Sequence, residues 1–252
     1  MKKYIVITYI VCVHAILGLV LLRGTVSEGV EKKDSANQSA QTEITEHFHH
    51  MVHYHARMDG NVPIGSVVFI GDSITQGLCV SAVAPTAVNY GIGSDTTVGV
   101  LQRLPVYNSI KRAGAVVIAI GINDLKLRTN EDILHNYSII AERIPENIPV
   151  VFSAVLPLDE KLFPDCRGWN QRIQTLNTDL KTFCDRSRNH FFVDAGPLLL
   201  DGQGNLAAEF HDRDGIHLNS KGNAIWIGEL RRALKNVQPK LAFNREPAIA
   251  NL

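Results

Sequence analysis

Residues 66–75 read SVVFIGDSIT, a short apolar run that ends in a glycine, an aspartate and a serine. The run Ser66–Ile70 is continuously hydrophobic and rich in β-branched residues, which indicates a strand covered on both faces. Gly71 and Asp72 favour a turn, so Ser73 would stand where a helix begins. A serine at such a turn is either a helix cap or an exposed nucleophile beside backbone N–H groups that stabilise developing negative charge.

The same pattern recurs along the chain. Four further apolar runs predict strands: Ala87–Tyr90, Ala115–Ile120, Val150–Val155 and His190–Val193. Longer segments with helical character separate or follow them: Thr97–Lys111, Glu131–Ile144, Trp169–Arg186 and Ser220–Leu234. Strands that alternate with helices in this way predict a doubly wound α/β fold with a parallel sheet and right-handed crossovers.

The composition fits one globular domain of this kind. The chain has 252 residues, of which 45% are hydrophobic and 20% are charged. That is enough to bury a substantial core, and too apolar for a disordered chain. The 25 basic residues equal the 25 acidic residues in number. Nucleic-acid-binding proteins normally show a basic excess, so this balance argues against a nucleic acid as partner.

The N-terminus differs in character from the rest of the chain. Residues 4–22 contain no Asp, Glu, Lys or Arg, and a helix of that length would be roughly 28 Å long, close to a bilayer core. Residues 1–24 would therefore form either a cleaved signal peptide or a retained anchor, with Lys2 and Lys3 on the cytoplasmic side. The absence of a clear small-x-small cleavage site favours the anchor. Both interpretations predict that the rest of the chain is exported.

The sequence after this segment divides into three parts. Residues 25–42 are mostly polar, which predicts a flexible linker. The folded domain would then occupy residues 43–240, followed by a tail of residues 241–252. The first element of the domain is a predicted helix from Glu43 to Arg57.

That helix and the cysteines raise the question of metal ligands and disulfides. His49 and His53 are four residues apart, but no Glu stands between them as in a hydrolytic zinc helix, so packing on the domain edge is the favoured interpretation. A disulfide between Cys166 and Cys184 is open, without a framework pattern to support it. No Cys-x-x-Cys occurs, which argues against a structural zinc site of that type.

Polar residues follow the second and third predicted strands. Residues 89–96 read NYGIGSDT and lack the third glycine of a dinucleotide-binding loop, which favours a loop that offers backbone donors beside Ser73. Residues 121–124 read GIND. The side chain of Asn123 would either donate an N–H into an oxyanion hole or cap the following segment, and both interpretations stay open.

The last polar block, residues 214–219, reads DGIHLN and precedes the final predicted helix. A neutral His217 can accept the proton of Ser73, and Asp214 can orient the imidazole and stabilise its cation. The competing interpretation is a metal site made of His211, Asp214 and His217, which is disfavoured because no further ligand cluster accompanies it.

Ligands of open α/β sheets bind beyond the carboxyl ends of the strands, so these blocks are expected to converge there. Together they resemble the SGNH (GDSL-type) hydrolases, in the order that family shows. The matching blocks are Gly71-Asp72-Ser73, the loop Asn89–Thr96, Gly121-x-Asn123-Asp124 and Asp214-x-x-His217. The first two blocks are most similar to the branch that includes platelet-activating-factor acetylhydrolase-like proteins and carbohydrate acetylesterases.

The resemblance implies a three-layer α/β/α sandwich around a five-stranded parallel sheet of flavodoxin-like type, with no cofactor and no metal. It implies Ser73 as nucleophile, His217 as base and Asp214 as its partner. The oxyanion hole would comprise the Ser73 N–H, the Asn123 side chain and an N–H of the second block, where Ser94 replaces the glycine usual in the family. If that position requires a positive φ, Ser94 introduces strain of about 1 kcal/mol or more.

These features predict a serine esterase that acts through an acyl-enzyme on a small-molecule ester, such as an O-acetyl group on a carbohydrate or another short acyl ester. The alternatives are a lysophospholipase or thioesterase, a membrane-tethered carbohydrate-binding protein without turnover, and a nucleotide-binding flavodoxin-like domain. Residues 156–169 would border the substrate pocket or form a packed surface loop. Membrane contact is expected only through the N-terminal segment.

Overall fold

The computed structural model describes residues 43–243. The predicted anchor or signal peptide, the predicted linker and most of the predicted tail lie outside these residues. Within the described part of the chain, no helix has the length and apolar character needed to cross a bilayer.

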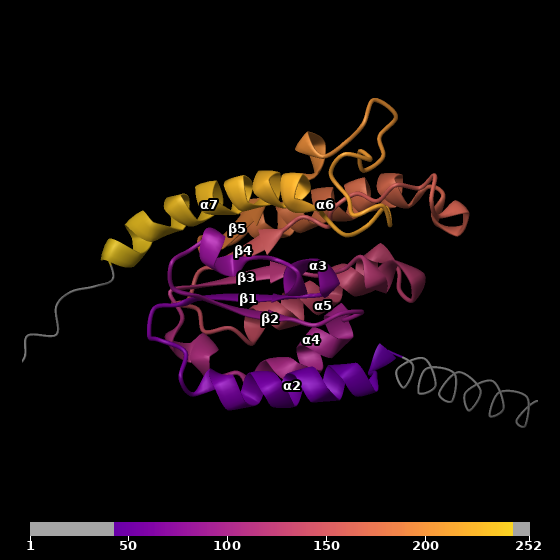
Figure 1. Ribbon diagram of the computed structural model, residues 1–252. Helices are drawn as coiled ribbons and strands as arrows, with labels where there is room; N and C mark the ends of the chain where they lie inside the picture. Colours follow the sequence, from indigo (N-terminus) through magenta and orange to yellow (C-terminus); the bar gives the residue numbers. More distant parts are fainter. Residues whose placement is uncertain (1–42, 244–252) are drawn as a thin grey trace, which may run out of the picture. The chain divides into compact units, whose positions relative to one another are not determined.

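Five parallel strands form the centre of the domain (Figure 1). They are β1 (Val67–Gly71), β2 (Ala87–Gly91), β3 (Ala115–Ala119), β4 (Val150–Ser153) and β5 (His190–Val193), in the order β2-β1-β3-β4-β5. The chain steps from β1 to one side and then returns past it to β3, which makes the carboxyl end of β1 and β3 a topological switch point. The predicted three-layer α/β/α fold with a five-stranded parallel sheet is confirmed.

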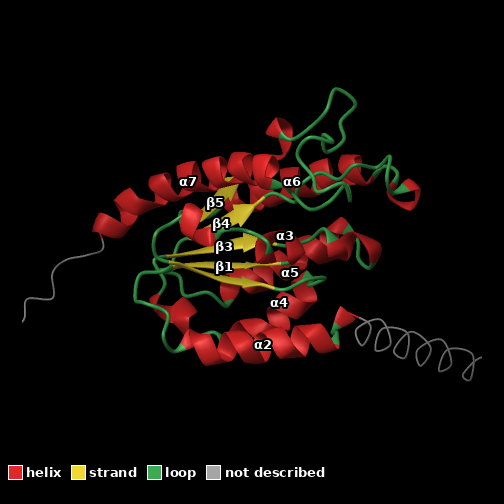
Figure 2. Cartoon of the chain, in the orientation of Figure 1, coloured by secondary structure: helices red, strands yellow, loops and turns green. Residues whose placement is uncertain are grey.

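Helices cover both faces of the sheet, as Figures 1 and 2 show. On one face the strand residues pack with α4 (Thr97–Arg103), α5 (Asn130–Glu142) and α6 (Trp169–Asp185), and on the other with α7 (Ser220–Phe243). Successive strand residues point to opposite faces, so Ile70 joins the first core and Phe69 joins the second. Because both faces are buried, the strands read as continuous apolar runs.

The helix α2 (Glu46–Asp59) lies at the β2 side of the sheet (Figure 1). The hydroxyl of Thr45 accepts the N–H of Phe48 and caps the helix. The buried ring of His55 packs 4.9 Å from the ring of Tyr90 on β2. The helix is therefore an integral part of the domain, as predicted from its packing pattern.

One predicted helix differs from the structure at Pro105. The predicted helix Thr97–Lys111 ends at Arg103 and continues as two short 3₁₀ turns, Leu104–Val106 and Asn108–Arg112. Proline lacks the N–H that would continue the α-helical ladder, and its ring clashes with the preceding turn. The helical run is thereby broken into three pieces.

The disulfide between Cys166 and Cys184 does not form, since both thiols are free. Cys166 precedes α6 and Cys184 lies in its last turn. A helix of about 15 residues separates positions by roughly 22 Å, whereas the Cα atoms of a disulfide lie within about 7 Å of each other. Burial raises the pKa of the Cys184 thiol to about 12, so this cysteine is a core residue.

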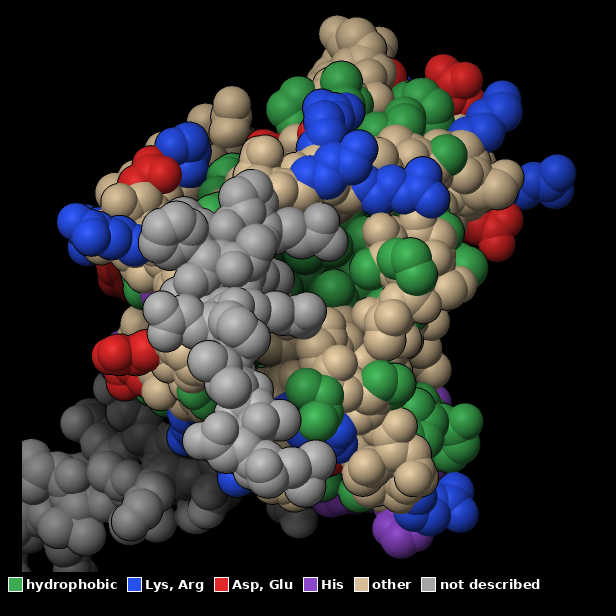
Figure 3. All heavy atoms as spheres, turned by 90° about the vertical axis from the view of Figure 1, so that its left-hand side faces the viewer, with side chains coloured by type: hydrophobic (Ala, Val, Ile, Leu, Met, Phe, Trp, Pro, Cys, Tyr) green, Lys and Arg blue, Asp and Glu red, His purple; other side chains and the backbone are tan. Residues whose placement is uncertain are grey.

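Figure 3 looks at the end of the domain where the strands begin. Lys and Arg side chains occur there together with Asp and Glu side chains around the rim. This mixture agrees with the equal numbers of basic and acidic residues in the whole chain.

Candidate active site

Ser73 lies directly after β1, at the first position of the short helix α3 (Ser73–Gln76). The cap of this helix is Asp72, whose Oδ1 accepts the N–H of Ile74 at 3.0 Å. Because Asp72 already fills the capping position, the Ser73 hydroxyl is available for another partner. That partner is His217, whose Nε2 lies 2.8 Å from the Ser73 Oγ.

His217 is itself held by Asp214 in the same turn. The His217 Nδ1 lies 2.5 Å from Asp214 Oδ2, and the other oxygen, Oδ1, accepts the N–H groups of Ile216 at 3.0 Å and His217 at 2.9 Å. The carboxylate therefore closes the turn and orients the ring at once. With Nδ1–H donating to Asp214, Nε2 is left to accept the Ser73 proton.

The electrostatics of the turn favour an ionised Asp214. Partial burial raises the pKa of this carboxyl, but the backbone N–H groups of Ile216 and His217 and the His217 ring outweigh it and hold the pKa below its usual range. The side chains of His217 and Asp214 are 46% and 44% exposed. The pair is thus ready to stabilise an imidazolium and is open to a substrate from solvent.

Asn123 follows β3 at the start of a 3₁₀ turn, Asn123–Lys126. Its Nδ2 donates one hydrogen bond to the backbone oxygen of Asp95 at 2.9 Å, which leaves its second N–H to point elsewhere. The turn is not capped by a side chain, so the capping interpretation of Asn123 does not describe the structure. Asp95 directly follows Ser94, and the two predicted oxyanion donors therefore meet at Asp95.

Ser94 has φ of 63°, a left-handed conformation. A residue with a Cβ is disfavoured there by about 1–2 kcal/mol, and glycine is not. The strain expected from the Gly-to-Ser departure is therefore present in this loop.

A buried arginine that the sequence reasoning missed ties these loops together. The Arg103 guanidinium donates to Asp95 Oδ2 at 2.8 Å, to the Tyr90 oxygen at 2.6 Å and to the Gly71 oxygen at 3.0 Å. Arg103 is 1% exposed, so its charge is compensated by Asp95 and by carbonyl dipoles rather than by water. One side chain thereby fixes the ends of β1 and β2 and the loop that follows β2.

A sequence signal for Arg103 existed. Val100 and Leu104 define the apolar face of the predicted helix, and Arg103 falls on that same face. A cation on a buried helical face requires a buried partner. Asp95, in the loop just before the helix, was the nearest acidic residue.

Asp124 plays a similar anchoring role after β3. It is fully buried, and its carboxylate accepts the Thr97 N–H at 2.9 Å and the Thr97 hydroxyl at 2.5 Å. Arg128 donates to the same carboxylate at 3.2 Å. The aspartate therefore joins the Asn123 loop to the start of α4.

Beside the nucleophile, Asp72 is buried in an unusual environment. Burial raises the pKa of Asp72 to about 7, with the nearby carboxylates of Asp95 and Asp124 raising it further and the Ile74 N–H and His217 opposing the shift. A small internal cavity of about 20 Å³ adjoins this carboxyl and Trp226. Asp72 thus titrates near neutrality next to Ser73, although it is not a member of the predicted triad.

The segment 156–169 packs against the turn that carries Asp214 and His217. Side-chain atoms of Leu162 and Phe163 lie 3.1 Å from the position that a Cβ on Gly215 would take. Leu162 is 49% exposed. This segment therefore covers one side of the turn and presents apolar surface next to it.

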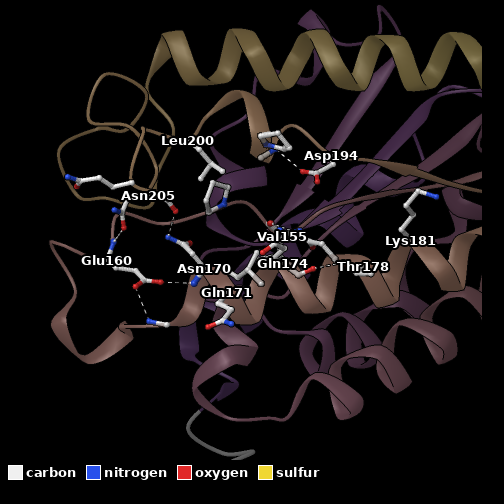
Figure 4. A pocket seen from close by; sticks show the side chains of 18 of the residues that line it. Val155, Glu160, Asn170, Gln171, Gln174, Thr178, Lys181, Asp194, Leu200 and Asn205 are labelled. Atoms are coloured by element: carbon white, nitrogen blue, oxygen red, sulfur yellow. Dashed lines mark hydrogen bonds between the residues drawn. The ribbon is translucent and has the colours of Figure 1, made fainter.

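On its other side the same segment lines a larger hollow (Figure 4). This cavity of about 620 Å³ lies between α6 and the segment that follows β5. Apolar side chains line part of it, and the rest of its lining includes carboxylate, amide and hydroxyl side chains: Glu160, Asn170, Gln171, Gln174, Thr178, Asn205. None of Ser73, Asn123 and His217 lines it. The cavity is therefore a neighbour of the proposed site and not the site itself.

The alternative prediction, a metal site made of His211, Asp214 and His217, does not fit the contacts that these side chains make. His211 is buried, and its Nδ1 accepts the Gly215 N–H at 3.0 Å, while Asp214 and His217 are engaged with each other. Among residues 43–243, no three or more His, Cys, Asp or Glu side chains gather as metal ligands would.

The fold, with a serine at the carboxyl end of β1 and a histidine within hydrogen-bonding distance of it, together with the family match that follows, defines the class as an α/β/α serine hydrolase of the esterase type. The family model of the GDSL-like lipase/acylhydrolases matches residues 69–225. The chain belongs to this family. Among proteins with curated descriptions, none is similar enough in sequence to count as a match.

Solved structures share the fold at low sequence identity. A protein from Streptococcus pneumonia, provisionally described as a platelet activating factor, is 22% identical, with a TM-score of 0.68 over 81% of this chain and 98% of its own. A mutant of an acetyl-xylooligosaccharide esterase from Geobacillus Stearmophilus is 20% identical, with a TM-score of 0.55 over 68% and 95%. The catalytic domain of the peptidoglycan O-acetyltransferase OatA from Streptococcus pneumoniae is 16% identical, with a TM-score of 0.54 over 70% and 97%.

Proposed function

We propose that the protein hydrolyses carboxylic esters through Ser73 as nucleophile, His217 as general base and Asp214 as the group that orients the base. The observation that carries this proposal is the unbroken series of hydrogen bonds from Asp214 Oδ2 through the imidazole to Ser73 Oγ, at 2.5 and 2.8 Å. These separations lie within the reach required for proton transfer.

In the first half of the reaction, Ser73 Oγ attacks the ester carbonyl carbon as its proton moves to His217 Nε2. The Asp214 carboxylate stabilises the resulting imidazolium. The tetrahedral intermediate collapses when the C–O bond of the alcohol breaks and His217 returns the proton to the departing oxygen. The acyl group is then bound to Ser73 as an ester.

In the second half, a water molecule takes the place of the alcohol. His217 accepts a proton from the water, whose oxygen attacks the acyl carbon, and the Ser73–acyl bond breaks as the serine regains its proton. The products are the carboxylic acid and the free enzyme. No redox partner or cofactor enters this balance.

The oxyanion of both intermediates would be held by the N–H groups of Ser73 and Ser94 and by the side chain of Asn123. The support for Asn123 is the bond to the Asp95 oxygen, which fixes the amide plane and leaves one N–H to donate. The support for Ser94 is a main-chain donor in a loop held by buried Arg103. Loss of one such donor typically lowers the rate by about 10²–10³-fold.

For the substrate, we propose a short acyl ester on a carbohydrate, with a lysophospholipid or a thioester as the alternative. Two observations favour the carbohydrate. The turn of Asp214 and His217 is nearly half exposed, so a bulky alcohol can approach it. The cavity beside the segment 156–169 contains the amide side chains of Asn170, Gln171 and Gln174, which can hydrogen-bond to sugar hydroxyls. The solved relatives include an acetyl-xylooligosaccharide esterase and a peptidoglycan O-acetyltransferase. An exported domain would meet such glycans, which accords with the N-terminal prediction.

The test is hydrolysis of a p-nitrophenyl acetate by the full-length protein and its Ser73→Ala variant. We expect the variant to lose turnover and fluorophosphonate labelling while keeping its thermal unfolding midpoint. The matched control is Ser81→Ala, an exposed serine, which should keep both. Turnover in the Ser73→Ala variant would refute the mechanism, and a wild-type chain that binds glycans but takes no label would favour the binding-protein alternative.

The substrate class is tested by competition between acetylated xylo-oligosaccharides, acyl esters of graded chain length and acyl thioesters. We expect the acetylated sugars to have the highest kcat/KM. A preference that grows with acyl chain length would instead favour the lysophospholipase alternative.

A further inference from the structure

The turn that carries Asp214 and His217 is fastened to the domain at its middle residue, Gly215. This glycine has φ of 74° and both of its polar backbone groups are bonded. Its N–H donates to His211 Nδ1 at 3.0 Å, and its oxygen accepts the Asp159 N–H at 2.8 Å. The side chains of Asp214 and His217 are nearly half exposed. The contacts of Gly215 with His211 and Asp159 therefore hold the turn from its buried side.

These contacts fix the protonation state of the His211 ring. The Gly215 N–H is a donor, so His211 Nδ1 must be unprotonated and a neutral ring carries its proton on Nε2. That Nε2 is buried, makes no hydrogen bond in the described structure and faces Asp159 Oδ2 at 3.7 Å. The other oxygen, Asp159 Oδ1, accepts the Lys161 N–H at 3.1 Å.

The result is a second imidazole–carboxylate pair beneath the first. Its side chains are 4% and 10% exposed, so neither can contact a substrate. His211 as a whole is 5% exposed, and its ring lies between the turn of residues 214–217 and the segment 156–169. A buried polar ring with one bonded nitrogen and one nitrogen aimed at a carboxylate is expected to have a defined role, because burial without one is costly.

We propose that His211 is a positioning residue for the reaction: its unprotonated Nδ1 holds the Gly215 N–H, and this bond fixes the turn that aims His217 at Ser73. Asp159 keeps the proton on the far nitrogen, so that Nδ1 remains an acceptor. The inference rests on the proposed function of Ser73, His217 and Asp214. If the His211 ring carried its proton on Nδ1, this N–H and the Gly215 N–H would face each other as two donors. The hydrogen bond that holds the turn would then be lost.

The test compares His211→Asn with His211→Gln in the full-length chain. The Asn Oδ1 occupies nearly the position of the imidazole Nδ1 and can still accept from Gly215. The Gln side chain reaches instead toward the former Nε2 position, leaving the Gly215 N–H without its acceptor. The two substitutions are therefore matched in polarity and differ in which nitrogen they replace.

We expect kcat to stay within about threefold of wild type for the Asn variant and to fall by about 10–100-fold for the Gln variant, because a displacement of about 1 Å in a catalytic group can cost 10²-fold. KM should change by less than twofold in both, since His211 does not contact the substrate. Equal effects of Asn and Gln on kcat would overturn the proposal, as would a change confined to KM.

A second measurement does not depend on turnover. NMR of the chain with ¹⁵N-labelled histidine should show His211 protonated on Nε2 only, and the low-field Nδ1 proton of His217 should persist in the Asn variant and be lost in the Gln variant. Protonation of His211 on Nδ1 at neutral pH would overturn the inference. If the wild type hydrolysed no ester while these NMR results held, the proposed function would fail and the positioning contact would stand.

Discussion

Two histidine–aspartate pairs meet at Gly215, and they differ in nearly every physical respect. The pair His217–Asp214 is 46% and 44% exposed, with its atoms 2.5 Å apart and its histidine directed at Ser73. The pair His211–Asp159 is 4% and 10% exposed, with its atoms 3.7 Å apart and its histidine directed at a backbone N–H. The same two side-chain types therefore stand in two different environments around one turn, with Asp159 contributed by a separate segment.

The difference follows from solvent access. A histidine that acts as a general base must be accessible to the substrate, and the positive charge that it gains must be stabilised as it forms. An exposed imidazole closely paired with a carboxylate meets both requirements. A buried imidazole out of reach of substrate, with one ring nitrogen bonded to a backbone N–H, is better suited to fixing backbone geometry. We therefore expect substitutions in the exposed pair to affect the rate, and substitutions in the buried pair to affect the position of the turn and the stability of the fold.

The largest effect is expected from the exposed pair. Asp214→Asn keeps the Oδ1 that closes the turn but presents an N–H₂ to His217, which favours the wrong tautomer. We expect kcat to fall by about 10³–10⁴-fold, with the free energy of unfolding changed by less than about 0.5 kcal/mol. The exposed neighbour Asp212→Asn is the control and should leave kcat unchanged. A fall below tenfold would remove Asp214 from the mechanism.

The buried pair should respond in both rate and stability. In Asp159→Asn, the amide oxygen would keep the Lys161 N–H and the amide nitrogen would face His211 Nε2. Two donors would then oppose each other, so kcat should fall by about 10-fold and unfolding should become easier by about 1–3 kcal/mol. Kinetics and chemical denaturation measure the two effects, with the exposed Asp165→Asn as control. Lower stability at unchanged kcat would separate this pair from the catalytic turn.

His55 offers a purely structural buried histidine for comparison. Burial, aided by Arg103, lowers the pKa of His55 from 6.5 to about 4. At pH 8 the ring is neutral in both states, but as the pH falls below 6.5 the unfolded chain takes up a proton that the folded ring refuses until about pH 4. Folding stability should therefore decrease across this window, by up to about 3 kcal/mol.

The effect of His55 is measured as the unfolding free energy between pH 8 and pH 4. In His55→Asn this one contribution disappears, and the decrease should be smaller than in wild type. The exposed His53→Asn on the same helix should leave the slope unchanged. Identical slopes in wild type and His55→Asn would show that the ring is not desolvated as described.

Asp72 is a buried acid, so burial shifts its pKa in the direction opposite to that of His55. Its pKa is raised from 3.8 to about 7 by burial, so the folded protein binds a proton more tightly than the unfolded chain and loses stability as the pH rises from about 4 to 7. Asp72→Asn keeps the acceptor for the Ile74 N–H and should stabilise the protein by about 2 kcal/mol at pH 8, with little change near pH 4. The exposed Asp179→Asn should show no such pH dependence. Destabilisation at pH 8 would mean that the folded protein stabilises the charged form of the Asp72 carboxylate, which contradicts a raised pKa.

The sheet, and the proximity of Ser73, His217 and Asp214, could be predicted from the sequence more readily than the buried network could. The five strands were recognisable because strands buried on both faces are apolar throughout, and His217 and Asp214 because both lie in one short turn. Arg103 and Asp159 were missed, since their partners are fixed only when separate loops meet at the sheet edge. The helix from Thr97 was predicted too long because the periodicity continues past Pro105.

The smallest effect is expected at Ser94, which is neither ionisable nor buried in a charge network. Its φ of 63° disfavours any side chain, so Ser94→Gly removes strain of about 1–2 kcal/mol. Glycine also adds freedom to the unfolded chain worth about 0.5–1 kcal/mol, so the net gain in folding stability should lie between about 0 and 1.5 kcal/mol. Because the proposed oxyanion donor is the main-chain N–H, kcat should change by less than about threefold. A loss approaching the 10²–10³-fold of a missing donor would show that the serine side chain itself holds the loop in its working geometry.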